Sequence, residues 1–191
     1  MAENTSVMTK KSTSVTDLVM IGVMAALICI AGPLSIPLPF TPVPISVTNL
    51  AIYIALFVLG WKRGTASCLI YLLLGFIGLP VFSSGRGGAA ILLGPTGGYL
   101  IGFLFMAVIA GWIMEHGKCK VVPAVLGMVA GLAITYLFGT IWFCIQSETG
   151  FIAALGMCVI PFLPGDAIKI VIAAVLGPIL RKYLAKAGVL I

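Results

Sequence analysis

Long apolar runs dominate the chain, and short segments rich in proline, glycine or charge separate them. A helix that crosses the hydrocarbon core of a bilayer needs about 20 mainly apolar residues. The runs predict six such helices, over residues 16–31, 46–60, 65–79, 99–114, 121–145 and 166–183. Residues 151–160 are too short to span and predict a partial helix. Residues 1–14 are polar and predict a flexible cytoplasmic N-terminus, which leaves 15–191 as a single transmembrane domain.

Composition supports a membrane protein and excludes a water-facing domain. Hydrophobic residues make up 61% of the chain and charged residues only 8%, whereas soluble domains carry roughly 25% charged residues. The predicted fold class is therefore an all-α membrane protein, a bundle of six transmembrane helices in contact with lipid. The formal net charge of +6 does not indicate a nucleic-acid partner, because the basic residues lie at the ends of the apolar runs.

The positions of the basic residues predict the orientation of the bundle. In a six-span topology, Arg86 and Lys169 fall on one face and nine other basic residues fall on the opposite face. Short loops rich in lysine and arginine stay in the cytoplasm, so both termini are predicted to be cytoplasmic. The nine residues are Lys10, Lys11, Lys62, Arg63, Lys118, Lys120, Arg181, Lys182 and Lys186.

Two irregular segments predict a ligand pocket in the outer half of the bundle. Residues 33–44 contain five prolines, and residues 80–98 are rich in glycine. The second and third predicted helices, which adjoin these segments, reach only about 22 Å of the ~30 Å core. Irregular backbone at membrane depth is tolerated where protein buries it or where it lines a cavity. We therefore expect the two loops to cover a pocket; the alternative is that they merely lie in the interface.

Charged residues outside the cytoplasmic face are the candidates for this pocket. Asp166 and Lys169 share one face of the last predicted helix, and ionisable groups inside a membrane helix mark a functional site by default. The alternatives are a structural cap with a lysine that reaches to the interface, or a proton relay. Arg86 stands among glycines, and a guanidinium suits a carboxylate ligand; its alternative role is loop solvation. Further candidates at outer helix ends are Asn49, Tyr99 and Gln146.

The sequence gives no sign of an enzyme, a metal site or a bound cofactor. It contains no phosphate-binding loop of the ATPase type and no HExxH motif. The five cysteines lack the spacing of metal ligands, and the single histidine, His116, lies in a predicted cytoplasmic loop without a nucleophile beside it. We therefore predict a binding or transport protein.

Several motifs resemble the BioY family. The most specific are LGPTGGYLIGF at residues 93–103 and PFLPGDAIK at residues 161–169. The others, in the order of the family, are VPIS at 43–46, GFIGLPVF at 75–82, GRGG at 85–88 and YLFG at 136–139. Together they are distributed along the chain from Val43 to Lys169. One departure is Thr48, where many members have glutamine.

The resemblance implies a biotin-binding S-component of an energy-coupling factor (ECF) transporter in a bacterial plasma membrane. Such a component binds biotin from outside with high affinity and works with a transmembrane coupling subunit and two ATPases. It also implies that Gly22 and Ala26, on the first helix, dock the coupling subunit. As a hypothesis, Asp166 accepts a bond from a ureido N–H, Lys169 donates to the ureido oxygen, and Arg86 attracts the carboxylate.

Three other functions stay open at this point. An S-component for a different vitamin would share the fold and differ in the pocket. An intramembrane enzyme would use Asp166 as an acid or base, although no second acidic group accompanies it. A purely structural membrane subunit would not need buried charge.

Overall fold

The computed structural model describes residues 15–39 and 41–188, so the N-terminal segment 1–14 predicted to be flexible lies outside the described residues. Within these described ranges, four stretches are long and apolar enough to cross a membrane: α2, α4, α5 and the run from α6 to α7. The helices are α1 (Val15–Ala31), α2 (Thr48–Phe76), α3 (Ala89–Leu93), α4 (Gly97–His116), α5 (Val121–Ser147), α6 (Phe151–Cys158) and α7 (Leu163–Lys186). Two 3-10 turns cover Ser83–Gly85 and Ile160–Phe162.

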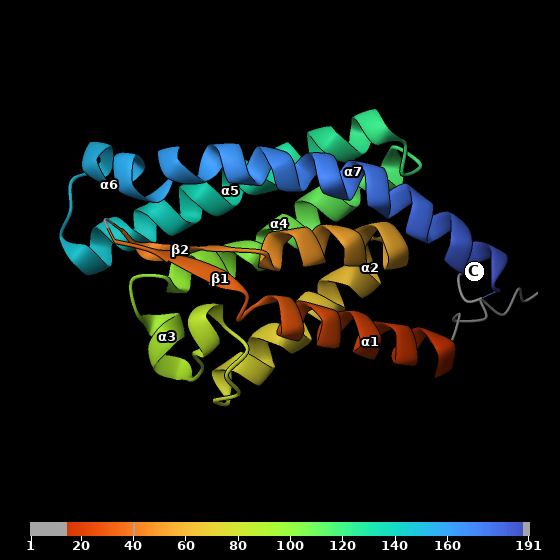
Figure 1. Ribbon diagram of the computed structural model, residues 1–191, viewed down its shortest axis with the longest axis horizontal. Coiled ribbons are helices and arrows are strands. Elements are labelled where there is room, and N and C mark those ends of the chain that lie inside the picture. Colours follow the sequence, from red (N-terminus) through yellow and green to blue (C-terminus); the bar gives the residue numbers. More distant parts are fainter. Residues whose placement is uncertain (1–14, 40, 189–191) are drawn as a thin grey trace, which may run out of the picture.

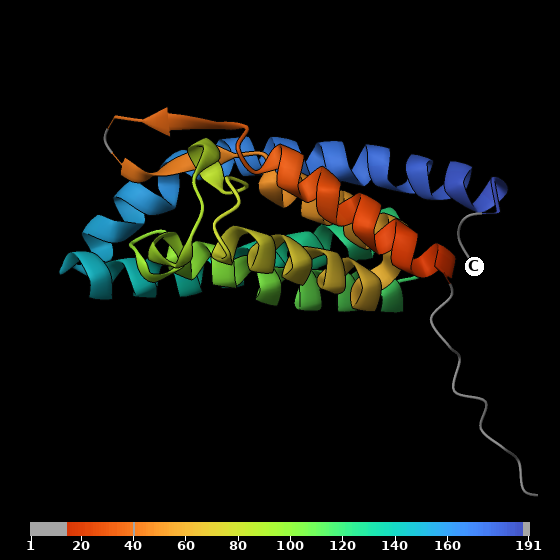
Figure 2. The same cartoon turned by 90° about the horizontal axis from the view of Figure 1, so that it is seen from below.

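Helix α2 consists of two halves that run in opposite directions. Gly60 has φ 77° and ψ 179°, a backbone conformation that interrupts the helix and that only glycine adopts without strain. Residues 48–59 and 61–76 then lie side by side, with the reversal at Gly60 (Figures 1 and 2). With α1, α4, α5 and α7, the two halves make up the six long helical segments of the described bundle. The predicted all-α fold class is confirmed.

The two ends of the bundle differ in character (Figure 1). One, which we call the hairpin end, carries a β-hairpin, the turn Ser83–Gly85, α3 and α6. The other, the basic end, carries the reversal of α2, the turn between α4 and α5 and the C-terminal end of α7. The described basic residues of the basic end are Lys62, Arg63, Lys118, Lys120, Arg181, Lys182 and Lys186.

The hairpin replaces the irregular structure expected for residues 33–44. Strands β1 (Ser35–Leu38) and β2 (Thr41–Ser46) pair antiparallel, with a register irregularity between Ile36 and Leu38. Proline cannot donate to a ladder and is confined to edges and bulges, which is why a segment with five prolines did not predict strands. An isolated hairpin is marginally stable; here Leu38, Val43 and Ile45 pack on a cluster that includes Tyr99 and Phe162.

Two helix bounds near the C-terminus also test the sequence analysis. The partial helix expected at 151–160 is present as α6. The last helix begins at Leu163 rather than at 166, because Pro164 lies in its first turn, where a missing N–H has no intrahelical partner to lose. Asp166 therefore lies one turn inside α7.

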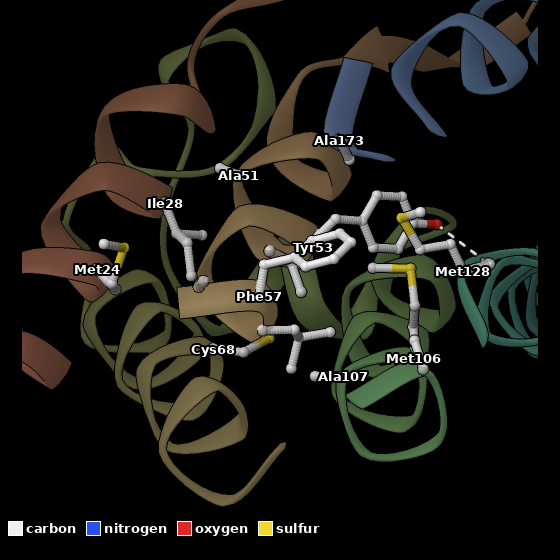
Figure 3. Packing of buried hydrophobic residues seen from close by; sticks show 14 of the residues in the cluster. Met24, Ile28, Ala51, Tyr53, Phe57, Cys68, Met106, Ala107, Met128 and Ala173 are labelled. Carbon is white, nitrogen blue, oxygen red and sulfur yellow. Dashed lines mark hydrogen bonds between the residues drawn. The ribbon is translucent and has the colours of Figure 1, made fainter. Parts of the chain in front are cut away.

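The first half of α2 is the central element of the core (Figure 3). Tyr53 and Phe57 are fully buried, and the Tyr53 hydroxyl donates to the carbonyl of Met128 in α5 at 3.3 Å. This bond satisfies a polar group where water is absent. Helix α1 packs on one side through Ile28, and α7 packs through Ala173. This packing fixes the position of the first half of α2, and with it the N-terminal turn that carries Asn49 at the hairpin end.

Candidate functional site

A partly enclosed cavity of about 310 Å³ lies at the hairpin end. Small-molecule sites are commonly about 300–1,000 Å³ and mostly apolar, with a few placed polar groups. The apolar walls come from the hairpin, α4, α5 and the turn before α7, and include Leu38, Val43, Leu100, Phe103, Leu132 and Phe162. Polar side chains gather at two places in this lining, one deep and one at the rim.

The deep polar group is centred on Asp166. Its Oδ1 accepts from Asn49 Nδ2 at 2.9 Å and from Lys169 Nζ at 2.8 Å, and its Oδ2 accepts from the Tyr136 hydroxyl. Lys169 Nζ also donates to the Ser46 carbonyl at 2.5 Å. The side chains of Asp166 and Lys169 are only 7% and 13% exposed. The network therefore joins β2, α2, α5 and α7 around one buried ion pair.

These contacts leave hydrogen-bonding capacity for a ligand. A carboxylate offers about four lone-pair positions, an ammonium three donors and an amide nitrogen two donors. Among the described residues, the bonds above use three positions on Asp166, two donors on Lys169 and one on Asn49. One acceptor and two donors therefore remain for a ligand in the cavity. Lys169 is not directed to the interface, because both of its bonds are to protein atoms of the network.

Arg86 lies at the rim of the cavity and is exposed. Its loop is built on an isolated bridge in which the Phe82 N–H donates to the Arg86 carbonyl at 2.9 Å. Phe82 is buried, and its ring packs edge-on against Tyr71 with centroids 5.5 Å apart. The anchored Phe82 thus fixes a loop whose guanidinium can meet an anionic group near solvent.

A second contact joins this loop to the hairpin, toward which the loop reaches in Figure 2. Ser35 Oγ in β1 accepts from the Ser84 N–H at 2.8 Å, and the two hydroxyls lie 3.3 Å apart. Ser84 has φ 61°, so the bond holds the loop in an uncommon conformation. We call this contact the Ser35–Ser84 latch. It ties together the two segments that cover the cavity.

The structure brings five of the six residues proposed for ligand binding to the same cavity: Asp166, Lys169, Arg86, Tyr99 and Asn49 all line it. Gln146 does not belong to this lining; it is exposed near the C-terminal end of α5. Gln146 was proposed because it lies at an outer helix end, and that position does not determine whether the side chain faces the cavity.

Tyr99 is held against α5 by a close helix contact. A Cβ on Gly139 would come within 2.3 Å of the Tyr99 ring, so glycine permits the approach. The Tyr99 hydroxyl lies 3.3 Å from Thr140 Oγ1 and 3.5 Å from the Cys158 carbonyl. Its polar end is thereby bound to protein, and the ring forms part of the cavity wall.

Sequence reasoning missed Tyr136 and Ser46. Tyr136 lies in an apolar run, where a tyrosine has the pattern of a core aromatic, and Ser46 contributes its backbone carbonyl. The one signal available was that both residues lie in segments that resemble the family, YLFG and VPIS.

Gly22 and Ala26 lie on the exposed face of α1. A Cβ on Gly22 would meet nothing within 4 Å, so this glycine is not required by packing within the described chain. The same face carries the exposed residues Val15, Leu18, Val19, Val23, Leu27 and Ile30. It is a continuous apolar surface with small residues in its middle.

Comparison with known proteins decides the family. The family model described as "BioY family" matches residues 5–186. The chain belongs to the BioY family. Among curated BioY proteins, the biotin transporter BioY of Rhizobium etli is 42% identical over 173 residues, which cover 86% of this chain and 92% of the relative. The biotin transporter BioY of Thermotoga maritima is 39% identical over 167 residues, 87% of this chain and 96% of the relative.

A solved structure agrees in fold. The crystal structure of an S-component for biotin from an ECF-type ABC transporter superposes with a TM-score of 0.82 at 37% identity, and covers 88% of this chain and 92% of that one. The resemblance drawn from the motifs is confirmed. These relatives are transport proteins, so the prediction that the chain is not an enzyme is confirmed by its family.

Proposed function

We propose that this chain is the biotin-binding S-component of an ECF-type importer in a bacterial plasma membrane. The observation that carries the proposal is the buried Asp166–Lys169 pair with Asn49 at the floor of the cavity. A buried charge pair contributes little to stability after desolvation, so a binding role is the better explanation of its presence. Similarity to named biotin transporters supports the choice of ligand.

Biotin matches the cavity in three places. Its ureido group offers two N–H donors and a carbonyl oxygen, which complement the acceptor left on Asp166 and the donors left on Lys169 and Asn49. Its apolar bicycle suits the walls formed by Leu100 and Phe103. Its carboxylate suits Arg86 at the rim. A site built this way rejects a ligand that would leave its buried polar groups unpaired.

In this proposal the hairpin end faces outside and the basic end faces the cytoplasm. The excess of lysine and arginine at the basic end supports that orientation. Biotin then enters at the outer face. A transmembrane coupling subunit and two ATPases provide the energy for its delivery inward, and the coupling subunit docks on the α1 face around Gly22 and Ala26, where small residues permit close helix approach.

Mass spectrometry of the purified protein tests the ligand. We expect biotin to co-purify, or to be retained after it is added and excess is removed. Retention of another vitamin would support an S-component of different specificity, and failure to bind biotin under saturating conditions would overturn the proposal.

Replacing Arg86 by glutamine is expected to slow biotin association about two- to fivefold at low salt, because a rim charge acts mainly on the on-rate. The difference from the wild type should fade as salt is raised to screen exposed charges. Stopped-flow binding at two ionic strengths measures both effects. Lys62→Gln is the matched control, since it removes an exposed charge at the opposite end. A difference that persists at high salt would contradict steering and indicate direct burial of the guanidinium.

Replacing Ser35 by alanine is expected to speed biotin dissociation about two- to fivefold, the scale of one hydrogen bond between exposed partners. The change removes the acceptor of the Ser84 N–H, so the hairpin and the Arg86 loop separate more easily. A chase with unlabelled biotin measures the rate. Ser147→Ala, which removes an exposed hydroxyl outside the cavity lining, is the control. Equal rates in Ser35→Ala and the wild type would show that the latch does not retain the ligand.

A further inference from the structure

The reversal of α2 separates the two partners of one helical hydrogen bond. In an uninterrupted helix the N–H of residue 61 would donate to the carbonyl of residue 57. The conformation of Gly60 prevents this. Instead, the Trp61 N–H donates to Glu115 Oε2 at 3.1 Å, and the Phe57 carbonyl accepts from Arg181 Nη1 at 2.8 Å. The N–H and the carbonyl that would have bonded each other are therefore each bonded to a charged side chain from another helix.

The signs of these charges suit the helix ends that they meet. Glu115, in α4, lies at the N-terminal end of the second half of α2, where a negative charge is favoured. Arg181, in α7, lies at the C-terminal end of the first half, where a positive charge is favoured. Arg181 Nη1 also donates to Cys119 Sγ, in the turn between α4 and α5, at 3.2 Å. The reversal is thus bonded to α4 and to α7, and Arg181 also bonds the turn that follows α4.

This arrangement reaches the cavity through two helices. The first half of α2 carries Asn49 at its hairpin end and Phe57 near the reversal, and α7 carries Asp166 and Arg181 in the same order. The two elements are bonded at both places, by Asn49–Asp166 and by Phe57–Arg181. Between these bonds they are in close contact, since a Cβ on Gly177 would come within 2.2 Å of the Phe57 ring.

We infer that Glu115 and Arg181 form a charge clamp on the broken helix, and that they are positioning residues for the Asn49–Asp166 contact in the cavity. The clamp holds the first half of α2 in register with α7. Both clamp residues are exposed, so their contribution to global stability is small and their effect is local. Neither residue touches the ligand site.

Hydrogen–deuterium exchange of the whole protein in detergent, read by mass spectrometry over peptides that contain residues 57–64, tests the clamp. Glu115→Met and Arg181→Met keep an unbranched side chain at each position but remove its acceptor or donor. We expect exchange at the reversal to rise about three- to tenfold in each, the scale of one ordinary hydrogen bond near the surface. Glu115→Gln and Arg181→Lys retain a bonding atom and should stay near the wild type.

Trp142→Phe is the matched control, because it removes another side-chain bond, to the Gly94 carbonyl, at the hairpin end. It should leave exchange at residues 57–64 unchanged. Wild-type exchange in both methionine variants would overturn the clamp. Equal exchange in Glu115→Gln and Glu115→Met would overturn its hydrogen-bond character.

The positioning role has a separate readout, which rests on the proposed function. Biotin dissociation should be about two- to fivefold faster in Arg181→Met and near wild type in Arg181→Lys, with equal unfolding temperatures. A purely structural role would shift both quantities or neither, and unchanged dissociation in Arg181→Met would overturn positioning. If the wild type binds no biotin, the proposed function fails, and the exchange measurement still decides the clamp.

Discussion

Replacing Asp166 by asparagine is expected to weaken biotin binding by about 1–3 kcal/mol, or roughly 5- to 150-fold in Kd. The carboxylate accepts bonds from Asn49, Lys169 and Tyr136. An amide in its place brings N–H donors to face these donors and leaves the buried ammonium of Lys169 without its counter-charge. The substitution therefore disorders every group that we assign to the ureido end of the ligand.

Titration calorimetry with purified protein measures this loss. Glu148→Gln is the control, because it makes the same chemical change at an exposed acid outside the cavity lining. Its Kd should equal that of the wild type. Lys169→Ala should resemble Asp166→Asn, since it removes the other member of the pair. Wild-type affinity in both Asp166→Asn and Lys169→Ala would contradict the site.

Replacing Gly60 by alanine is expected to lower the free energy of unfolding by about 1–3 kcal/mol, the strain of an L-residue held in a conformation that favours glycine. The residue has φ 77° and ψ 179°, and its added Cβ would come within 2.8 Å of Glu115 Oε2. The carboxylate would have to leave the Trp61 N–H, so the substitution also disturbs the reversal between the two halves of α2.

Thermal unfolding in detergent measures this effect, at about 2–4 °C in Tm for each kcal/mol in a chain of this size. The control is Gly156→Ala, an exposed glycine of α6 whose added Cβ would meet nothing within 4 Å. Alanine is favoured in a helix, so that variant should unfold at the wild-type temperature or slightly above it. Equal Tm values for Gly60→Ala and the wild type would show that the break tolerates a side chain.

The spanning segments could be predicted because lipid imposes a simple rule. Apolar runs of nearly membrane length and basic residues at one set of ends determine a six-span bundle. The hairpin could not be predicted, because the prolines of residues 33–44 argue against strands. Its pairing depends on contact with residues such as Phe162, which lies more than a hundred positions away.

The residues of the candidate site were likewise predicted only in part. Asp166 and Lys169 were evident because charge inside a membrane helix is rare, and Arg86 because it stands outside the basic face. Tyr136 has neither of these sequence signals. Only the packing of α5 against α7 shows that its hydroxyl bonds Asp166. Arg181 entered the sequence analysis only as one of the basic residues that predict the orientation, and Glu115 did not enter it, because the sequence does not show which backbone groups a break at Gly60 releases.

A structure of the protein with biotin bound is the most direct test of the account. We predict one biotin in the cavity, with its ureido group within hydrogen-bond distance of Asp166, Asn49 and Lys169 and its carboxylate toward Arg86. A biotin bound outside this cavity, or bound in it with its carboxylate at Lys169 and its ureido group at the rim, would contradict the account.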